Sequence, residues 1–363
     1  MNSPLQIGLV GPLPPPYGGM ANQTQQLAEL LRSEGLAVSL LQTNAAYRPQ
    51  WVSGLPFTRA LFRLIPYLYD LWQLAGRADL IHIMANSGWS WHLFAAPAVW
   101  IAKIRKVPVV VNYRGGEADT FLAKSVRSVR ITMRQTSALI VPSGFLQAVF
   151  ARFNMPASVV PNIIDVARFN NSAPRRAIRR RLLVPRNLEP IYDNESAIMA
   201  FSIVHRSYPD ATLTIAGSGP LAESLAVLAE TLGLAGAVIF AGRLDRDAMA
   251  QAYRAADIAI NPSLVDNMPN SVLEALASGV PVVSTNVGGV PFIVKDEQTA
   301  LLVAPKSPAA MAKAILRLMD DAALSDKLID NGLVEVQKFT WPQVWPLLSE
   351  VYGKARHLTC LPA

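Results

Sequence analysis

The sequence has 363 residues, of which 51% are apolar and 16% charged, so it predicts large buried cores and excludes a disordered chain. Its single cysteine, Cys360, excludes an intramolecular disulfide and a cysteine-based zinc site, and it indicates a reducing compartment. The net charge is +7; residues 1–174 hold 15 basic and 7 acidic residues, whereas residues 175–363 hold 18 and 19, so an anionic partner is expected in the first half.

Short aliphatic runs alternate with helical patterns in the first half of the chain. The predicted strands are residues 6–11, 37–43, 80–84, 108–113, 138–142 and 159–161. Helices are expected between them, as over 22–33 and 57–75. The uncharged stretch 80–102 contains two histidines and a proline, so it predicts a strand and then a buried helix (89–104) rather than a membrane span.

The second half repeats this alternation. Its predicted strands are 182–188, 211–217, 238–243, 258–262, 281–286 and 300–303, and its last helices are 308–320, 322–338 and 342–356. Continuous apolar runs separated by helices are typical of parallel sheets covered on both faces, so we expect an α/β protein with two Rossmann-like domains. The expected divisions are an N-terminal domain (1–170), a polar linker (171–181), a C-terminal domain (182–340) and a final helix (341–363) that packs on the first domain.

Two glycine-rich turns lie between a predicted strand and a predicted helix. Gly18 and Gly19 follow the first strand, where a glycine pair lets a phosphate or a sugar approach the backbone; a tight turn that needs positive φ is the alternative. Gly217 and Gly219 match the Gly-x-Gly-x-x-Ala dinucleotide pattern, but they follow the second strand of their domain, and the next strand holds no carboxylate. A nicotinamide cofactor is therefore not expected.

Acidic and histidine residues form no metal-binding pattern. Asp245 and Asp247 resemble a metal-holding Asp-x-Asp, but they begin a helix, where aspartate caps backbone amides and favours the positive end of the dipole. The four histidines are scattered without ligand spacing: His82, His92, His205 and His357. The sequence therefore predicts no metal.

The segment 261–275 has the most informative pattern. A loop with Asp266 follows a predicted strand, and Asn270 or Ser271 begins a helix that holds Glu274 about one turn later. Amides at this helix start suit a diphosphate, Glu274 can accept both hydroxyls of a ribose, and Asp266 can accept hydroxyls of a sugar. The alternative is a capping box of Ser271 and Glu274 without a ligand, which does not explain Asp266.

These residues resemble the retaining family 4 glycosyltransferases of GT-B fold. Asp266 and Glu274, with seven residues between them, resemble the family's Glu-x7-Glu signature, and the continuation through 275–283 to Gly288-Gly289 is also similar. Further matching positions, in chain order, are Gly18-Gly19, Asp79-Leu80-Ile81-His82, Pro161-Asn162-Ile163-Ile164-Asp165 with Phe169, Gly217-Ser218-Gly219-Pro220, and Tyr253 with Ala256-Asp257. The resemblance covers nearly the whole chain.

The resemblance implies a GT-B protein with a cleft between its domains, C-terminal helices that return to the first domain, and metal-independent transfer of a sugar from a nucleotide diphosphate donor with retention. By family match, Glu274 binds the donor ribose, Asp266 contacts the donor sugar, and Arg186 neutralises the diphosphate leaving group. The remaining positions expected to contact the donor are Gly18, Gly19, Gly217, Gly219, Asn267, Met268, Pro269, Asn270, Ser271 and Val272.

Three positions depart from the family pattern. The family's first glutamate is an aspartate here, one methylene shorter. The lysine that commonly follows Arg186 is absent, so Arg243 or helix dipoles are expected to meet the leaving-group charge. Arg114 stands where the family often has a histidine, and we expect it to contact donor phosphate or an anionic acceptor, or else to pair with Glu117 or Asp119.

Basic and aromatic residues of the first half suit an anionic surface. The basic ones are Arg59, Arg63, Lys103, Arg105, Lys106, Lys124, Arg127, Arg130 and Arg134, and the aromatic ones are Trp51, Phe57, Phe62, Tyr67, Tyr69 and Trp72. This mixture favours anionic lipid head groups or a lipid-diphosphate acceptor, with an ordinary solvated face as the alternative. Nucleic acid is not expected, because no recognition motif accompanies the charge.

Together these features predict a hexosyltransferase-type, retaining glycosyltransferase with a glycan or lipid-linked acceptor, in cell-surface polysaccharide synthesis. No segment has the pattern of a secretory leader, so we expect a cytoplasmic protein, peripheral on the inner face of the membrane. The alternatives are a nucleotide-sugar epimerase or a phosphorylase on the same fold, and a catalytically silent subunit that binds a nucleotide sugar.

Overall fold

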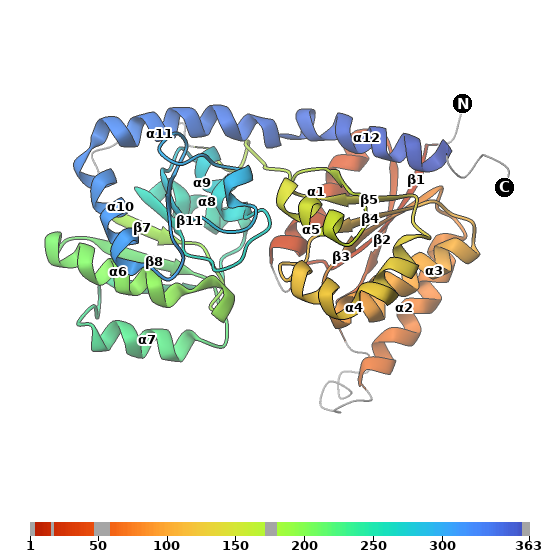
Figure 1. Cartoon of the computed structure of the whole chain (residues 1–363), viewed down its shortest axis with the longest axis horizontal. Coiled ribbons are helices and arrows are strands. Elements are labelled where there is room, and N and C mark those ends of the chain that lie inside the picture. Colours follow the sequence, from red (N-terminus) through yellow and green to blue (C-terminus); the bar gives the residue numbers. More distant parts are fainter. Residues whose placement is uncertain (1–3, 16–17, 47–58, 171–179, 358–363) are drawn as a thin grey trace. The chain divides into compact units, whose positions relative to one another are not determined.

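The computed structural model describes residues 4–15, 18–46, 59–170 and 180–357. The chain divides into two compact units, each with its own sheet (Figure 1). Unit 1 consists of Met1–Ile163 and Val344–Ala363, and unit 2 consists of Ile164–Gln343. Among the helices of the described ranges, none is both long and apolar enough to cross a membrane.

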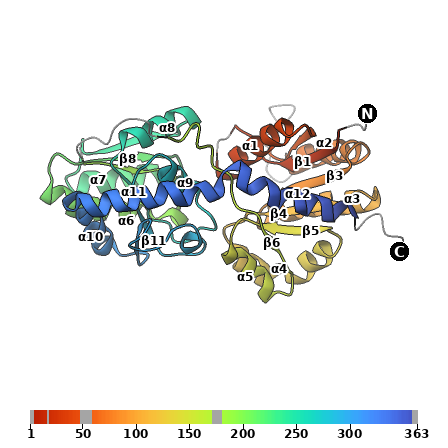
Figure 2. The ribbon, with the colours of Figure 1, turned by 90° about the horizontal axis from the view of Figure 1, so that it is seen from above.

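Unit 1 is built on a parallel sheet of six strands in the order β2-β1-β3-β4-β5-β6. The strands are β1 (Gln6–Gly11), β2 (Ala37–Gln42), β3 (Leu80–Ala85), β4 (Val109–Tyr113), β5 (Ala138–Val141) and β6 (Ser158–Val159). The helices are α1 (Gly19–Ser33), α2 (Arg59–Ala75), α3 (Ala96–Ile104), α4 (Ala118–Met133) and α5 (Gly144–Arg152), with a π-helical turn (Trp91–Ala95) before α3. Figure 2 shows α12 (Trp341–His357) lying across the strands of this unit, and its Tyr352 contacts His82 of β3.

Unit 2 is built on a second parallel sheet of six strands in the order β12-β11-β10-β7-β8-β9. The strands are β7 (Arg181–Val184), β8 (Thr212–Ala216), β9 (Val238–Gly242), β10 (Ile258–Asn261), β11 (Val282–Thr285) and β12 (Leu301–Val303). The helices are α6 (Asn194–Ser207), α7 (Ala222–Thr231), α8 (Arg246–Ala255), α9 (Asn270–Ala277), α10 (Pro308–Asp320) and α11 (Ala322–Glu335).

The alternation of side chains along each strand explains the two covered faces. Leu182 and Val184 of β7 belong to the core formed with α6, α7 and α10, whereas Leu183 between them belongs to the core formed with α8 and α9. In Figure 1 these two sets of helices lie on opposite faces of the sheet of unit 2. Because both faces of the sheet are buried under helices, strands such as β7 are apolar at successive positions.

The predicted α/β architecture with two parallel sheets is confirmed, and each predicted strand is present. The prediction extends β7 to Leu188, but the strand ends at Val184 because Pro185 has no N–H for the ladder. The helix predicted over 322–338 is divided into α11 and a 3-10 turn, Val336–Phe339.

The division between the units falls after Ile163, earlier than the predicted linker at 171–181. The amide of Ile164 donates to the carbonyl of Phe339 at 2.9 Å, and Ile164 and Phe169 belong to the core of unit 2. This short segment is therefore anchored in unit 2. Of the linker, residues 171–179 lie outside the described part of the chain.

The strand order places the loops that could bind a ligand. In each sheet the first strand of the unit (β1 or β7) lies between two others, and the chain crosses to one side of it and later to the other. Ligands of such sheets bind beside this strand, beyond the carboxyl ends of the strands. In unit 2 the loops after β7 and β10 meet there and hold Arg186 and Asp266. In unit 1 the corresponding end of β1 leads to Gly18 and Gly19, and Arg114 directly follows β4.

Candidate active site

Arg186 and Asp266 form an ion pair at the carboxyl end of the sheet of unit 2. Nη2 of Arg186 contacts Oδ2 of Asp266, and Nε of Arg186 donates to Oδ1 of Asn261 at 2.7 Å. The Arg186 and Asp266 side chains are only 11% and 12% exposed. The guanidinium carbon also lies 5.1 Å from the centre of the Tyr192 ring. The guanidinium is therefore held from three sides, two polar and one aromatic.

Asn261 is fixed in turn by a buried network of hydroxyls. Ser263 Oγ donates to Asn261 Oδ1 at 2.9 Å, and Asn261 Nδ2 donates to Ser284 Oγ at 2.9 Å. Thr285 Oγ1 donates to the carbonyl of Ser263 at 2.5 Å. These side chains are at most 2% exposed, so their bonds are made in a dry environment and favour one orientation of the carboxamide. The network gives Arg186 a rigid acceptor, and no local sequence signal marks Asn261 for this role.

The glycines predicted to contact the donor in unit 2 make room for protein backbone. A Cβ on Gly217 would lie 2.1 Å from the carbonyl oxygen of Arg186, and one on Gly219 would lie 2.3 Å from that of Leu188. The two loops are also joined by a hydrogen bond from the Leu188 amide to the Ser218 carbonyl, 3.2 Å long. Any side chain at Gly217 or Gly219 would therefore displace the loop that holds Arg186.

The loop of Asp266 is closed by a second glycine pair. Gly288 has φ +51°, and a Cβ there would lie 2.1 Å from the carbonyl oxygen of Asp266. The amide of Gly289 donates to this same oxygen at 2.8 Å. Burial raises the pKa of the Asp266 carboxyl, although Arg186 acts in the opposite direction.

Glu274 lies on α9 beside the buried Tyr253. The Tyr253 hydroxyl lies 3.2 Å from Glu274 Oε2 and 2.9 Å from the carbonyl oxygen of Ser271. Burial raises the pKa of Glu274 to about 7, against smaller opposite effects of Tyr253, Arg246 and Arg186. A carboxylate in this setting has oxygen lone pairs to offer to hydroxyl donors once it is ionised.

The capping box considered for Ser271 and Glu274 does not form. Pro269 is the N-cap of α9, and no side chain caps this helix. Glu274 turns to Tyr253 instead, and the buried Oγ of Ser271 has no hydrogen-bond partner among the described residues. The expectation that Asn270 or Ser271 caps the helix is therefore wrong, because Pro269 takes the N-cap position and both residues already lie within α9.

The other residues predicted in the loop before α9 differ in what they can offer. Met268 and Val272 are 6% and 1% exposed and belong to the core, and the amide of Val272 donates to the carbonyl of Pro269 at 3.1 Å. Asn267 is also buried, while Asn270 is half-buried at the first position of the helix. Backbone groups at the start of α9, rather than apolar side chains, are the part of this loop suited to an anion.

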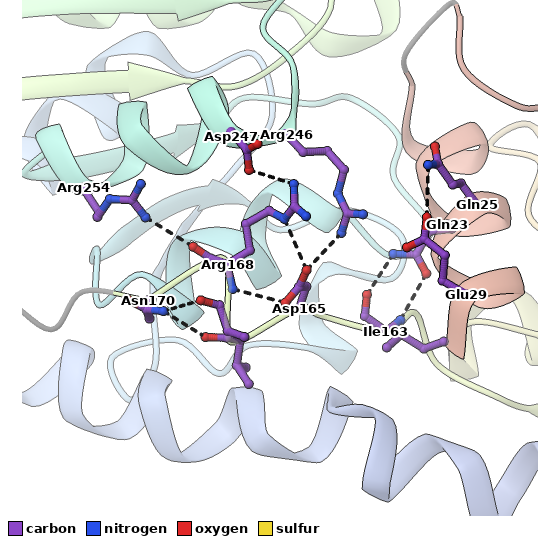
Figure 3. A network of polar contacts seen from close by, with 12 residues as sticks. Gln23, Gln25, Glu29, Ile163, Asp165, Arg168, Asn170, Arg246, Asp247 and Arg254 are labelled. Carbon is purple, nitrogen blue, oxygen red and sulfur yellow. Dashed lines mark hydrogen bonds and ion pairs between the residues drawn. The ribbon is translucent and has the colours of Figure 1, made fainter. Parts of the chain in front are cut away.

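The predicted role of Asp245 as a helix cap is confirmed. Its carboxylate accepts from the amide of Ala248 at 2.8 Å, and Asp247 pairs with Arg168 at 2.8 Å, as drawn in Figure 3. Arg168 also pairs with Asp165 at 3.3 Å. Within the described ranges, no three histidine, cysteine or acidic residues are grouped as metal ligands would be.

Arg246, to which the sequence pattern assigned no role, is a basic residue of α8 whose charge reaches Glu274. Its guanidinium lies 3.4 Å from Asp165 Oδ2 (Figure 3), its side chain is 15% exposed, and its charge lowers the pKa of Glu274. Arg243, which we expected to meet the leaving-group charge, is exposed at the end of β9. The sequence pattern drew attention to the two aspartates that flank Arg246 and not to the arginine itself.

In unit 1, Gly18 and Gly19 begin α1. Gly18 is the N-cap with φ −173°, an extended conformation that any residue adopts, and neither glycine has positive φ. The alternative of a tight turn that needs positive φ is therefore wrong. Apart from its chain neighbours, no described residue lies within 4 Å of a Cβ built on Gly18, so the described part leaves open space at the start of this helix.

Arg114 is oriented by two amide side chains. Its Nε donates to Asn112 Oδ1 at 3.1 Å, and its Nη1 contacts Asn162 Oδ1. Burial lowers the pKa of Arg114 to about 10, so it keeps its charge at neutral pH. The alternative partner Asp119 binds Arg152 instead, at 2.8 Å. Amide oxygens orient a guanidinium without cancelling its charge, which suits a group that binds an anion.

Comparison with known protein families gives two matches, one for each unit. The family described as "Glycosyl transferase 4-like domain" matches residues 18–162, and the family described as "Glycosyl transferases group 1" matches residues 171–334. Glycogen synthase of Mycobacterium tuberculosis is 29% identical over 294 residues, 77% of this chain and 70% of that protein. D-inositol 3-phosphate glycosyltransferase of Acidothermus cellulolyticus is 33% identical over 215 residues, 54% of this chain and 48% of that protein. This second match therefore spans about half the length of that relative.

Solved structures show the same fold at low identity. Sucrose-phosphate synthase from Thermosynechococcus elongatus has a TM-score of 0.77 at 20% identity, over 98% of this chain and 100% of that one. Anabaena HepE in complex with UDP has a TM-score of 0.74 at 18% identity, over 96% and 99%. Since the family matches cover both units and the fold agrees with them, the chain belongs to the group 1 glycosyl transferases, the retaining family 4 enzymes of GT-B fold.

Proposed function

We propose that unit 2 binds a nucleotide diphosphate sugar through Arg186, Asp266 and Glu274. The strongest support is that one guanidinium (Arg186) and two carboxyls (Asp266 and Glu274) lie together beyond the carboxyl ends of β7 and β10. These groups have little exposure to solvent and are held by buried hydrogen bonds. Arg186 would face the diphosphate, Glu274 would accept the ribose hydroxyls, and Asp266 would accept hydroxyls of the sugar. The Nη1 group of Arg186 makes no hydrogen bond to a described residue and is the part of the guanidinium left for a phosphate.

The proposed reaction needs no enzyme nucleophile. The bond between the anomeric carbon and the phosphate oxygen breaks, and its electron pair goes to the departing diphosphate, whose new charge Arg186 stabilises. The acceptor hydroxyl forms its bond on the face that the diphosphate leaves, and its proton passes to a diphosphate oxygen. The configuration at the anomeric carbon is therefore retained. Asp245 and Asp247 are engaged by the backbone and by Arg168, so the proposal relies on arginine rather than on a metal for the leaving-group charge.

The donor and acceptor classes are also part of the proposal. Structures of HepE, which shares this fold, contain UDP and UDP-glucose, so UDP-hexoses are the donors to test first. For the acceptor we propose a glycan or a lipid-linked sugar, used in cell-surface polysaccharide synthesis at the inner face of the membrane. The net positive charge of residues 1–174 supports an anionic acceptor.

A donor screen followed by product analysis tests this function. We expect one or a few nucleotide sugars to raise the melting temperature of the wild-type protein, and an α-linked donor to give an α-linked product by NMR. Inversion at the anomeric carbon would overturn the mechanism. Conversion of the donor without any acceptor would show an epimerase, and donor binding without transfer to any glycan or lipid-linked acceptor would show a silent subunit.

An exposed apolar surface supports the proposed membrane contact. We call it the α2–α3 surface, and it comprises Phe62, Ile65, Tyr69 and Trp72 of α2 with Trp100 and Ile104 of α3. The spacing in α2 puts its four residues on one helical face. The guanidinium carbon of Arg105 lies 4.7 Å from the Trp72 ring, and Lys103 and Lys106 are exposed beside it. Apolar side chains next to basic ones are typical of a surface that binds anionic lipid.

Some residues predicted for an anionic surface lie outside the α2–α3 surface. Tyr67 is 4% exposed and its hydroxyl donates to the carbonyl of Phe94, so it belongs to the core. Arg130 is half-buried and donates to the carbonyl of Phe153 at 2.9 Å. Lys124 and Arg127 are exposed on α4, and Arg134 is exposed directly after its end. Trp51, Phe57 and the Arg59 side chain lie outside the described part.

The variant Ile65→Glu/Tyr69→Glu is expected to bind vesicles of phosphatidylglycerol and phosphatidylcholine about tenfold more weakly than wild type, a change of about 1.4 kcal/mol. It removes two side chains that are each 65% exposed and adds two negative charges. Co-sedimentation measures the effect. The control Val227→Glu/Val334→Glu changes two exposed apolar residues of unit 2 and should bind as wild type does. Equal binding by both variants would contradict the assignment.

A further inference from the structure

A buried chain of hydrogen bonds in unit 1 connects α12 to Arg114. Tyr352 Oη lies 2.7 Å from His82 Nδ1, and His82 Nε2 lies 3.1 Å from Asn112 Nδ2. Asn112 Oδ1 then accepts from Arg114 Nε at 3.1 Å. Tyr352, His82 and Asn112 are 3%, 0% and 2% exposed, so these contacts are made without competition from water.

The donors and acceptors of this chain follow from Arg114. A guanidinium can only donate, so the carboxamide of Asn112 must present its oxygen to Arg114 and its NH2 to His82. His82 Nε2 is therefore the acceptor, and the proton of the neutral ring is on Nδ1, where it donates to the Tyr352 hydroxyl. Burial and the charge of Arg114 lower the pKa of His82 to about 3, so the ring stays neutral and the pattern is kept.

The second amide that holds Arg114 is fixed from α1. Asn162 contacts Nη1 of Arg114, and the next residue, Ile163, is bound at both backbone groups by the side chain of Gln23. Gln23 Nε2 donates to the Ile163 carbonyl at 2.9 Å, and the Ile163 amide donates to Gln23 Oε1 at 3.1 Å (Figure 3). Gln23 lies in α1, the helix that begins with Gly19. Arg114 is therefore held by two hydrogen-bonded networks of unit 1, one that leads to α1 and one that leads to α12.

We propose that Asn112 and Asn162 are positioning residues that aim the Arg114 guanidinium at an anionic group of the substrate, and that Tyr352, through His82, makes α12 part of this device. The proposal rests on the proposed function and on the expectation from the sequence that Arg114 contacts a donor phosphate or an anionic acceptor. It gives the last helix a role in turnover besides its role in packing. Asn112 and Asn162 contact Arg114 directly, whereas His82 and Tyr352 act on it through Asn112.

The variant Tyr352→Phe tests the proposal because it removes one hydroxyl and keeps the ring. We expect kcat/KM to fall about fivefold to tenfold when Arg114 loses its fixed aim. Tyr67→Phe is the matched control, since it also removes a buried hydroxyl of unit 1 that makes one hydrogen bond, to Phe94. Equal kcat/KM for the two variants, measured well below their melting temperatures, would show that Tyr352 serves packing alone.

The background variant Arg114→Ala separates this inference from the proposed function. If Tyr352 acts through Arg114, Tyr352→Phe should change kcat/KM of Arg114→Ala by less than twofold. Full activity of Arg114→Ala would refute the expected contact of Arg114 with the substrate. A large loss in Arg114→Ala with an additive effect of Tyr352→Phe would leave that function intact and overturn the positioning role.

The isosteric variant Asn112→Asp gives a spectroscopic readout that does not depend on activity. It replaces the NH2 donor facing His82 Nε2 by an acceptor, so His82 must now present a proton from Nε2. We expect the ¹⁵N signal of His82 Nε2 to change from the unprotonated to the protonated position. An unchanged signal would show that Asn112 does not set the His82 tautomer, and the connection between Tyr352 and Arg114 would be lost.

Discussion

Replacing Arg186 by alanine is expected to lower kcat by about 10²–10³-fold, the usual effect of removing one fixed donor from a group that gains charge in the transition state. The guanidinium is placed for this role by Asn261 and Tyr192 and is only 11% exposed, so water would replace it poorly. Donor affinity should fall less than kcat, because most of the charge on the leaving diphosphate develops as the bond breaks. Steady-state kinetics with the identified donor measure both effects.

The same substitution also affects folding, and a second variant separates the two effects. Without Arg186, the 12% exposed Asp266 loses its partner, which should cost about 1–3 kcal/mol of unfolding free energy. In Arg186→Ala/Asp266→Asn the unpaired charge is gone, so stability should recover while kcat stays low. Recovery of kcat together with stability would show that Arg186 serves only the fold.

A surface ion pair of the same unit provides the baseline. Arg317 pairs with Glu297 at 2.7 Å, but these side chains are 45% and 51% exposed. Arg317→Ala should change the unfolding free energy by less than about 1 kcal/mol and leave kcat unchanged. This result would show that the loss in Arg186→Ala comes from the location of the charge and not from the removal of an arginine.

The sequence was sufficient for the architecture because burial on two faces leaves a direct pattern. Strands such as β7, whose successive residues face opposite helix layers, must be apolar at each position, and Pro185 shows where the ladder ends. Where the pattern was less complete, the structure differs in detail. The uncharged stretch after β3 starts with a π-helical turn before α3, and no residue preference marks such a turn.

The site was only partly predictable, for a different physical reason. Arg186, Asp266 and Glu274 could be named because their spacing follows the ends of strands and helices. The groups that hold them could not: Asn261 is 75 residues from Arg186, and Tyr253 is 21 residues from Glu274. Such partners are brought together by the topology of the sheet, and a single amide or hydroxyl has no local signature.

The role of a glycine in the site is also hard to predict from the sequence alone. Gly217 and Gly219 follow a nucleotide-binding pattern, but the space they leave is taken by the backbone of Arg186 and Leu188. Gly18 matches no such pattern beyond a glycine pair, and among the described residues the space beside its Cα is open. The sequence shows where a side chain is missing, and only the structure shows what lies in its place.

Donor affinity is expected to fall as the pH decreases below about 7, because Glu274 must be ionised to accept the ribose hydroxyls. Burial raises the pKa of Glu274 to about 7, so the protonated form dominates below that value in the free enzyme. If the donor binds only the ionised form, Kd should rise about tenfold for each pH unit below the pKa and become constant above it. Calorimetry near pH 6 should then show the release of almost one proton for each donor bound, measured in buffers of different ionisation enthalpy.

Glu274→Gln and Tyr253→Phe should change the pH profile in different ways. Glu274→Gln cannot titrate, so its weaker donor binding should not vary across this pH range. Tyr253→Phe removes the hydroxyl that lowers the pKa of Glu274, so the inflection should move to higher pH while the carboxylate itself remains. An inflection that moves down in Tyr253→Phe, or that persists in Glu274→Gln, would assign the titration to another group.

Asp266→Asn is a further control, because Asp266 lies in the same site and its pKa is also raised. This variant should weaken the contact with the sugar but leave the inflection of the pH profile near pH 7.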